Sequence, residues 1–149
     1  MAAGMTVQRE LFKFLQAFLG KELSKNKFVQ VNRLEIDGVI HLSYVNFDTI
    51  RVLHQLGPFG SGNPEPLFIL VNVRVKHSSV VNDRHVRCLI VGERGAPLRA
   101  FAFRSKDSNV GHALLAHHGS LMHIAGILRR YLWRFRDNIL FIIEDYAYA

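Results

Sequence analysis

The stretch Leu56–Pro66, LGPFGSGNPEP, divides the chain into two parts with different periodicities. It holds three of the four prolines and three of the eleven glycines, a density that is incompatible with a regular helix or strand. Phe59 in its middle makes it too apolar for a flexible tether. No Lys-Ser/Thr pair follows it, which argues against a phosphate-binding glycine loop. We therefore predict that residues 57–66 form an ordered crossover between two domains.

The residues after the crossover predict mainly β-strands. Val71–Lys76 alternates apolar and polar residues, which is typical of a half-buried strand with a basic outer face. The other predicted elements are, in chain order, strands at Val86–Ile90 and Leu98–Arg104, a helix at Asp107–His118 that stops at Gly119, a strand at Leu121–Leu128 extending up to Phe135, a turn at Asp137–Asn138 and a strand at Ile139–Tyr146. Three strands, one helix and two strands is the order of a five-stranded OB-fold barrel.

The residues before the crossover predict a smaller α/β part. Apolar residues at helical spacing predict a helix over Val7–Leu19, and Phe28–Ile36 predicts a strand that turns at Asp37–Gly38. A second helix is expected at about Asp48–Leu56, with Asp48 as its N-cap. The predicted fold class is therefore α+β, with a small N-terminal part at residues 1–56 and an OB-fold at residues 67–149.

The positive charge is concentrated in the second part of the chain. Residues 1–67 carry 7 basic and 6 acidic side chains, whereas residues 68–149 carry 12 and 6, and 10 of those 12 are arginines. Arginine binds phosphate in a fork and stacks on bases, so an anionic polymer is the expected partner. A basic surface that only aids solubility is the alternative.

Membrane and secretory roles are not expected. The longest continuous apolar run, Ile139–Ile143, is far shorter than the ~20 residues that span a bilayer, and Met1–Gly4 lacks the start of a secretory signal. A single cysteine, Cys88, excludes an internal disulfide and fits a reducing, cytoplasmic setting.

The crossover carries a resemblance to a known family. Leu56–Phe68, LGPFGSGNPEPLF, closely resembles the L-x-P-F-G-x-G-N-P-E-P-x-F signature of the RecJ single-strand DNA exonuclease family. Two weaker similarities support it: Met1–Val7 looks like the end of the family's G-G-H-x-x-A-A-G segment, and Glu35–Gly38 lies where the family has an Ile-Asp strand end.

The resemblance implies that this chain is the C-terminal part of such an exonuclease. Residues 1–56 would be the remnant of a DHHA1 domain, and residues 67–149 an OB-fold that holds single-stranded DNA during 5′-to-3′ degradation in DNA repair and recombination. The family's catalytic DHH domain binds Mn²⁺ or Mg²⁺, but no Asp-His-His triplet occurs here, so we expect no cofactor in this chain. The chain resembles a fragment that binds DNA and does not cut it.

The densest candidate site is the segment Arg129–Arg136, which alternates arginines with aromatic residues. Guanidinium groups can meet phosphates while rings stack on unpaired bases. In a strand, Tyr131 and Trp133 share one face and Arg130 and Arg134 the other, so the rings could instead belong to the core. The predicted nucleic-acid contacts of this segment are Arg129, Arg130, Tyr131, Trp133, Arg134 and Arg136.

A second group of cations lies on the first three predicted strands. If those strands are neighbours, Arg74, Lys76 and Arg87 can share an outer surface. The full second group is Arg74, Lys76, Arg87, Arg99 and Arg104. Scattered surface charge is the alternative.

Two other functions remain open at this stage. OB-folds also dock proteins, so the chain could recruit single-strand-binding protein or another repair factor, and an RNA-binding module would use the same residue types.

The histidines do not form a metal-binding site, because His117 and His118 point about 100° apart on a helix and no cysteine or carboxylate pair completes a tetrahedral site.

Overall fold

A computed structural model describes residues 4–25, 33–116, 119–133 and 136–149 of the chain. These residues form two compact units, Met1–Leu34 and Glu35–Ala149, which we describe separately.

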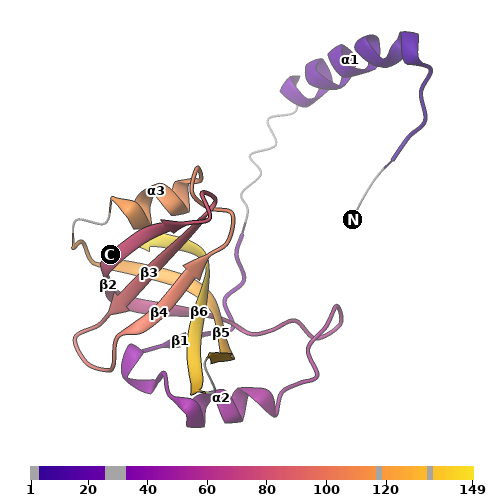
Figure 1. The fold of residues 1–149 in the computed structure, drawn as a ribbon. Helices are drawn as coiled ribbons and strands as arrows, with labels where there is room; N and C mark the ends of the chain where they lie inside the picture. The colour runs from indigo at the N-terminus through magenta and orange to yellow at the C-terminus, as the bar shows by residue number, and fades with distance from the viewer. Residues whose placement is uncertain (1–3, 26–32, 117–118, 134–135) are drawn as a thin grey trace. The chain divides into compact units, whose positions relative to one another are not determined.

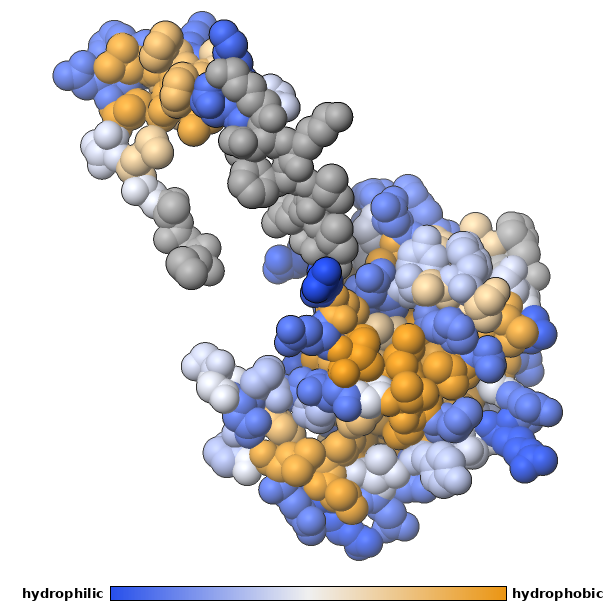
Figure 2. Space-filling view, turned by 180° about the vertical axis from the view of Figure 1, so that it is seen from behind, coloured by the Kyte–Doolittle hydropathy of each residue, from blue (hydrophilic) through white to orange (hydrophobic). Residues whose placement is uncertain are grey.

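The first unit contains a short 3-10 helix, η1 (Arg9–Leu11), that leads into α1 (Phe12–Lys25). The predicted helix is therefore present, but it starts later than Val7 and continues through Gly20. Apolar side chains lie along α1 (Figure 2), and Phe14 and Phe18 are 72% and 50% exposed. Most of the strand predicted at Phe28–Ile36 lies outside the described residues, and residues 33–36 are not in a strand.

The second unit is a barrel (Figure 1). Its strands are β1 (Gly38–Ile40), β2 (Leu67–Val81), β3 (His85–Val91), β4 (Leu98–Ala102), β5 (Met122–Trp133) and β6 (Arg136–Tyr148). They form one sheet in the order β1-β2-β3-β4-β6-β5, and the pairing of β5 with β2 closes it. The three strands, one helix and two strands expected of an OB-fold are therefore confirmed.

Closure depends on the length and curvature of β2. Its first residues, Leu67–Leu70, pair with β5, and its later residues, Arg74–Val81, pair with β3. The register shifts between Leu70 and Val73 and again between Val75 and His77. Bulges of this kind bend a strand and increase its twist, which lets one strand serve two sides of a barrel.

The barrel interior is filled by the apolar residues of each alternating strand, as the sequence predicted. Val86, Cys88 and Ile90 of β3 are all buried, whereas Arg87 between them is exposed. The side chains with the least exposure are Leu70, Val86, Ile90, Ala100, Leu114, Met122, Ile124 and Phe141.

Helices lie at both ends of the barrel (Figure 1). At one end is α3 (Asn109–Leu115), whose Leu114 is fully buried; Ser108 is its N-cap and accepts a hydrogen bond from the Gly111 amide. α3 is shorter than the predicted helix: it begins at Asn109 and not at Asp107, and it ends at Leu115 with Ala116 as its C-cap, before Gly119, whose φ of 75° favours glycine.

At the other end are η2 (Leu42–Tyr44) and α2 (Phe47–His54), which contribute the buried Leu42 and Ile50. The prediction of Asp48 as N-cap is wrong: the Asn46 side chain accepts the Thr49 amide at 2.9 Å. Asp48 lies one position inside the helix and pairs with Arg51 instead.

The sixth strand, β1, was not predicted. It runs parallel to β2, with Gly38 opposite Phe68 and Ile40 opposite Leu70. The predicted turn at Asp37 is wrong, because Asp37 anchors β1 to β2: its amide donates to the Leu67 carbonyl at 2.9 Å and its carboxylate accepts the Leu67 amide at 2.7 Å.

β1 and α2 share the barrel's hydrophobic core, through Ile40 and Ile50. The barrel's compact unit therefore begins at Glu35. The assignment of residues 1–56 to a DHHA1-like remnant stays a prediction.

The crossover between α2 and β2 is held by its own hydrogen bonds. Gly60 and Asn63 exchange backbone hydrogen bonds of 2.8 and 3.1 Å. The Asn63 side-chain amide donates to the carbonyls of Leu56 and Pro58, at 2.9 and 3.1 Å. The asparagine of the family-like signature thus ties together the loop that contains it.

The predicted turn at Asp137–Asn138 is wrong. Both residues lie in β6, where Asp137 is opposite Leu132 and Asn138 is opposite Tyr131. Their turn propensity is overridden by the long β5–β6 pairing, which reaches Trp133 and Arg136.

Candidate nucleic-acid interface

The outer face of β3 and β4 alternates cations with apolar residues. Arg87 of β3 is directly opposite Phe101 of β4, and Leu89 is opposite Arg99. Directly opposed residues in an antiparallel pair have their side chains on the same face. Because the intervening residues, such as Cys88 and Ala100, are buried in the core, these four side chains lie outside the barrel.

Strands β6 and β5 extend this face beyond β4. Arg99 lies opposite Leu140 of β6, and Tyr131 of β5 lies within hydrogen-bonding range of Arg99. Together they line a groove of about 910 Å³. Its walls are His77, Val81, Asn82, Arg87, Cys88, Leu89, Arg99, Ala100, Phe101, Tyr131 and Leu140. We call it the arginine groove.

The two arginines of the groove carry uncompensated charge. Arg87 donates to the Ser79 hydroxyl at 3.2 and 3.3 Å, and Arg99 donates to the Tyr131 hydroxyl at 3.5 Å. Within the part of the chain that the structure describes, neither forms an ion pair with a carboxylate. Both hydroxyls are neutral, so each guanidinium keeps its positive charge for an anionic ligand.

Two arginines of the predicted Arg129–Arg136 segment are engaged elsewhere. Arg129 pairs with Glu65 of the crossover at 2.7 Å, and Arg130 forks onto both carboxylate oxygens of Asp137 at 2.8 and 2.7 Å. The hydrogen bond and charge of Asp137 raise the pKa of Arg130. Neither arginine lines the arginine groove, where Tyr131 is the segment's contribution.

The structure describes only part of the remaining residues of the Arg129–Arg136 segment. Arg136 is exposed at the start of β6. Trp133 is the last residue of β5, but its side chain is not among those described, and Arg134 lies outside the described residues.

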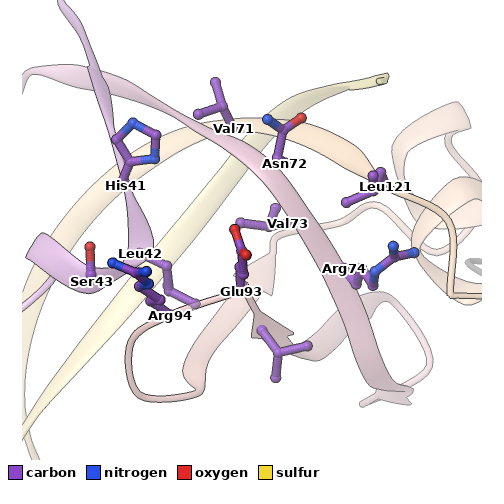
Figure 3. Close-up of a pocket in the computed structure, with 12 residues that line it drawn as sticks. His41, Leu42, Ser43, Val71, Asn72, Val73, Arg74, Glu93, Arg94 and Leu121 are labelled. Atoms are coloured by element: carbon purple, nitrogen blue, oxygen red, sulfur yellow. The ribbon is translucent and has the colours of Figure 1, made fainter.

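Arg74 and Lys76 of β2 are not among the residues that line the arginine groove with Arg87. Arg74 lines a second cavity, of about 730 Å³ (Figure 3). Its guanidinium donates to the Gly119 carbonyl. Lys76 is exposed within the bulge of β2, between Val75 and His77. Lys76 is the extra residue of that bulge, because Val75 pairs with Ile90 and His77 with Leu89.

Arg104 lies beyond the end of β4, in a shallow cavity with Asp83, Arg84, Lys106 and Asp107. Lys106 pairs with Asp83 there, and that contact raises the pKa of Lys106. Along the chain, the aromatic residues Phe101 and Phe103 lie between Arg99, which lines the arginine groove, and Arg104, which does not.

Sequence reasoning missed the aromatic wall of the groove. Phe101 was included in a predicted strand but was not chosen as a contact. A signal was present in Arg99–Arg104, RAFAFR, where large residues alternate with two alanines. The small alanines occupy the crowded core, so the cation and the rings must face outwards.

Cys88 borders the groove floor but is suited to packing. Burial raises the pKa of its thiol to about 12, so it is protonated and unreactive at neutral pH. Among the described residues, no group of three or more histidine, cysteine, aspartate or glutamate side chains is arranged to hold a metal ion. No described helix is long and apolar enough to span a membrane.

The closed barrel and its basic, aromatic outer face define an OB-fold module with a groove suited to an anionic strand. The family model of the RecJ OB domain matches residues 36–145. This chain therefore belongs to the RecJ OB domain family.

Known proteins agree with that assignment. The chain is 27% identical over 100 residues to the single-stranded-DNA-specific exonuclease RecJ of Escherichia coli, covering 66% of this chain and 17% of that protein. It is 27% identical over 153 residues to RecJ of Bacillus subtilis, covering 99% of this chain and 19% of that protein. The chain thus spans about a fifth of the length of the curated relatives it matches.

The fold is also found in a solved structure. RecJ from Thermus thermophilus, crystallised in complex with Mn²⁺, matches with a TM-score of 0.67 and 20% identity, over 98% of this chain and 20% of that one. This likeness confirms the fold.

Proposed function

We propose that this chain binds single-stranded DNA in the arginine groove. One observation carries the proposal: Arg87, Arg99, Phe101 and Tyr131, from three different strands, line a single groove on the outer face of the barrel. Two cations without a carboxylate partner among the described residues and two rings are the side chains that a strand binder combines.

The cations would hold the phosphate backbone. Arg87 and Arg99 are offset along neighbouring strands, since their cross-strand partners are Phe101 and Leu89. Diagonal neighbours on a sheet are about 7–8 Å apart, a spacing that lets the two forks reach different phosphates of one strand. Each phosphate contact releases counterions, so the affinity should fall steeply with salt.

The rings would hold the bases. Phe101 and Tyr131 both line the groove, one on β4 and the other on β5. A base can lie flat on a ring only if it is unstacked and unpaired, so the arrangement favours a single strand over a duplex. No readout of particular base edges is required for this mode of binding.

We further propose that this binding serves a RecJ-like 5′-to-3′ exonuclease in DNA repair and recombination. The family membership of residues 36–145 and the names of the relatives support this role. The module would hold the strand, while a catalytic domain with Mn²⁺ or Mg²⁺ would remove nucleotides. A single buried cysteine suits a reducing compartment such as the cytoplasm.

The test is fluorescence anisotropy of a labelled single-stranded oligonucleotide, with unlabelled duplex and matched RNA as competitors. We expect micromolar or tighter binding that single-stranded DNA displaces better than duplex does. Tyr131→Leu should reduce that preference, because it removes a ring from the groove. Tyr44→Leu, at an exposed tyrosine of η2, is the matched control. Folded protein that binds no oligonucleotide would overturn the proposal.

A second candidate is docking of single-strand-binding protein. The cavity of Figure 3 favours it, because two cations, Arg74 and Arg94, and one carboxylate, Glu93, line it beside apolar residues such as the exposed Leu121, away from the arginine groove. A peptide with acidic and apolar residues suits such a lining. Binding of a tail peptide from that protein, lost in Arg94→Gln and not displaced by oligonucleotide, would support this second site.

A further inference from the structure

Three rings meet on the outer face of the barrel beside the arginine groove. Phe101 and Phe103 have ring centroids 4.7 Å apart. His85 of β3 contacts both, with centroids 5.5 Å from each, and is edge-on to Phe103. We call His85, Phe101 and Phe103 the aromatic cluster.

The core does not explain why Phe103 is there. It follows the last residue of β4 and is 56% exposed, whereas Ala100 and Ala102 fill the interior beneath the cluster. Because more than half of Phe103 is exposed to water, its ring gives up much of the stabilising free energy that full burial would supply. Its contacts are with the other two rings, so it extends an aromatic surface outside the core.

One ring of the cluster, His85, is anchored by a hydrogen bond. The backbone amide of Arg104 donates to the Nδ1 atom of His85 at 2.9 Å, which anchors the imidazole. The φ of Arg104 is 51°, so the chain turns sharply after Phe103. A pre-oriented surface binds a planar ligand without a large loss of side-chain entropy.

The cluster also connects two cationic regions. Phe101 belongs to the arginine groove as well, so the cluster begins where the groove ends. Beyond it lie Arg84, Arg104 and Lys106, together with the carboxylates of Asp83 and Asp107. Lys106 is paired with Asp83, and among the described residues Arg84 and Arg104 form no ion pair.

We propose that the aromatic cluster is a base-stacking platform, with Phe103 as the exposed ring on which an unpaired base lies. This inference rests on the proposed function of the arginine groove and extends it. A bound strand then runs from Tyr131, past Arg99 and Arg87, to Phe103, with cations on both sides of the platform. Neither Phe103 nor His85 was among the contacts predicted from sequence.

The test is a double-mutant cycle between Phe103→Ala and an oligonucleotide in which single bases are replaced in turn by abasic sites. Stacking of one base on a ring corresponds to an affinity loss of about 5- to 150-fold on substitution by alanine. We expect Phe103→Ala to weaken binding within that range. With the abasic site at the contacting position, the same substitution should have little further effect, because the base it contacts is gone.

Two further variants keep the test independent of folding. Phe103→Trp should retain or improve the affinity, since tryptophan also offers a face for stacking. Phe47→Ala, at a 49% exposed phenylalanine of α2, removes the same side chain at a position that does not line the groove and should leave binding unchanged. Circular dichroism and thermal unfolding of each variant report on folding.

The outcomes separate this inference from the proposed function. If Arg87→Gln with Arg99→Gln weakens binding but Phe103→Ala does not, the platform is wrong and the groove stands. If Phe103→Ala acts equally on intact and abasic oligonucleotides at every position, the ring does not contact a base, and the platform is again wrong. If the wild-type protein binds no single strand, both proposals fail together.

Discussion

Replacing Gly111 by alanine should destabilise the barrel, although alanine is the better helix former. Gly111 lies in the first turn of α3, where an added Cβ would be 1.8 Å from the carbonyl oxygen of Ser105 and 2.6 Å from its carbonyl carbon. Such approaches do not occur between real atoms, so either the helix or the preceding loop must move.

Neither can move freely. The Ser105 carbonyl accepts the amide and the hydroxyl of Ser108, at 2.9 and 2.8 Å, and Ser108 caps the helix. On the other side, Leu114 of the same helix is fully buried in the core. Overpacking costs about 1–3 kcal/mol and loss of a cap about 1 kcal/mol, while the helix propensity of alanine returns about 1 kcal/mol. We therefore expect a net loss of about 1–3 kcal/mol.

Urea unfolding followed by circular dichroism measures this loss as a lower midpoint. Gly60→Ala is the matched control, because its added Cβ would meet nothing within 4 Å, and its effect should stay within about 0.5 kcal/mol. A Gly111→Ala protein as stable as the wild type would refute the close contact between α3 and the loop before it.

Three further predictions concern single side chains. Burial raises the pKa of Cys88 to about 12 from 9.0, so the thiol stays protonated in the folded state at pH values where it ionises in the unfolded state. The contribution of the buried thiol to the free energy of unfolding is therefore complete below pH 9 and is lost as the pH rises from 9 to 12. Wild type should therefore lose about 1.4 kcal/mol per pH unit more than Cys88→Ala in alkaline urea titrations, and parallel curves would contradict the burial. Asn63→Asp removes the donor to two loop carbonyls and should lower stability by about 1 kcal/mol in thermal unfolding, whereas an unchanged midpoint would show that the loop does not need it. Arg130→Gln breaks an exposed ion pair and should leave the thermal unfolding midpoint nearly unchanged, with little effect on oligonucleotide affinity; an affinity loss equal to that of Arg99→Gln would return Arg130 to the binding site.

The barrel could be predicted because the sequence pattern that specifies each of its longer strands lies within that strand. The alternation of Val86, Cys88 and Ile90 with Arg87 sets one face of β3 inwards, and the order of strands and helix then selects an OB-fold. The strand β1 could not be found in this way. It is only three residues long, and it is fixed by the bonds of Asp37 to Leu67, thirty positions away.

The binding site was only partly predictable for the same reason. The sequence indicated Arg87, Arg99 and Tyr131 as contacts, but their meeting in one groove depends on the registers of β3, β4, β5 and β6. The pairing of Arg129 with Glu65 joins residues 64 positions apart, so composition could not reveal that this arginine is occupied. The bulge in β2 likewise leaves Lys76 without a partner on β3, because His77 and not Lys76 follows Val75 in the register.

The most direct test of the central claim is the salt dependence of single-strand binding, measured by anisotropy for wild type, Arg87→Gln with Arg99→Gln, and the control Arg51→Gln. Arg51 lies on α2 and pairs with Asp48, outside the groove. Each phosphate contact contributes about 0.7 to the slope of log affinity against log salt for a single strand, so losing two should flatten the slope by about 1.4. The arginine groove predicts that flattening in the double variant and an unchanged slope in Arg51→Gln. Equal slopes in all three proteins would contradict it.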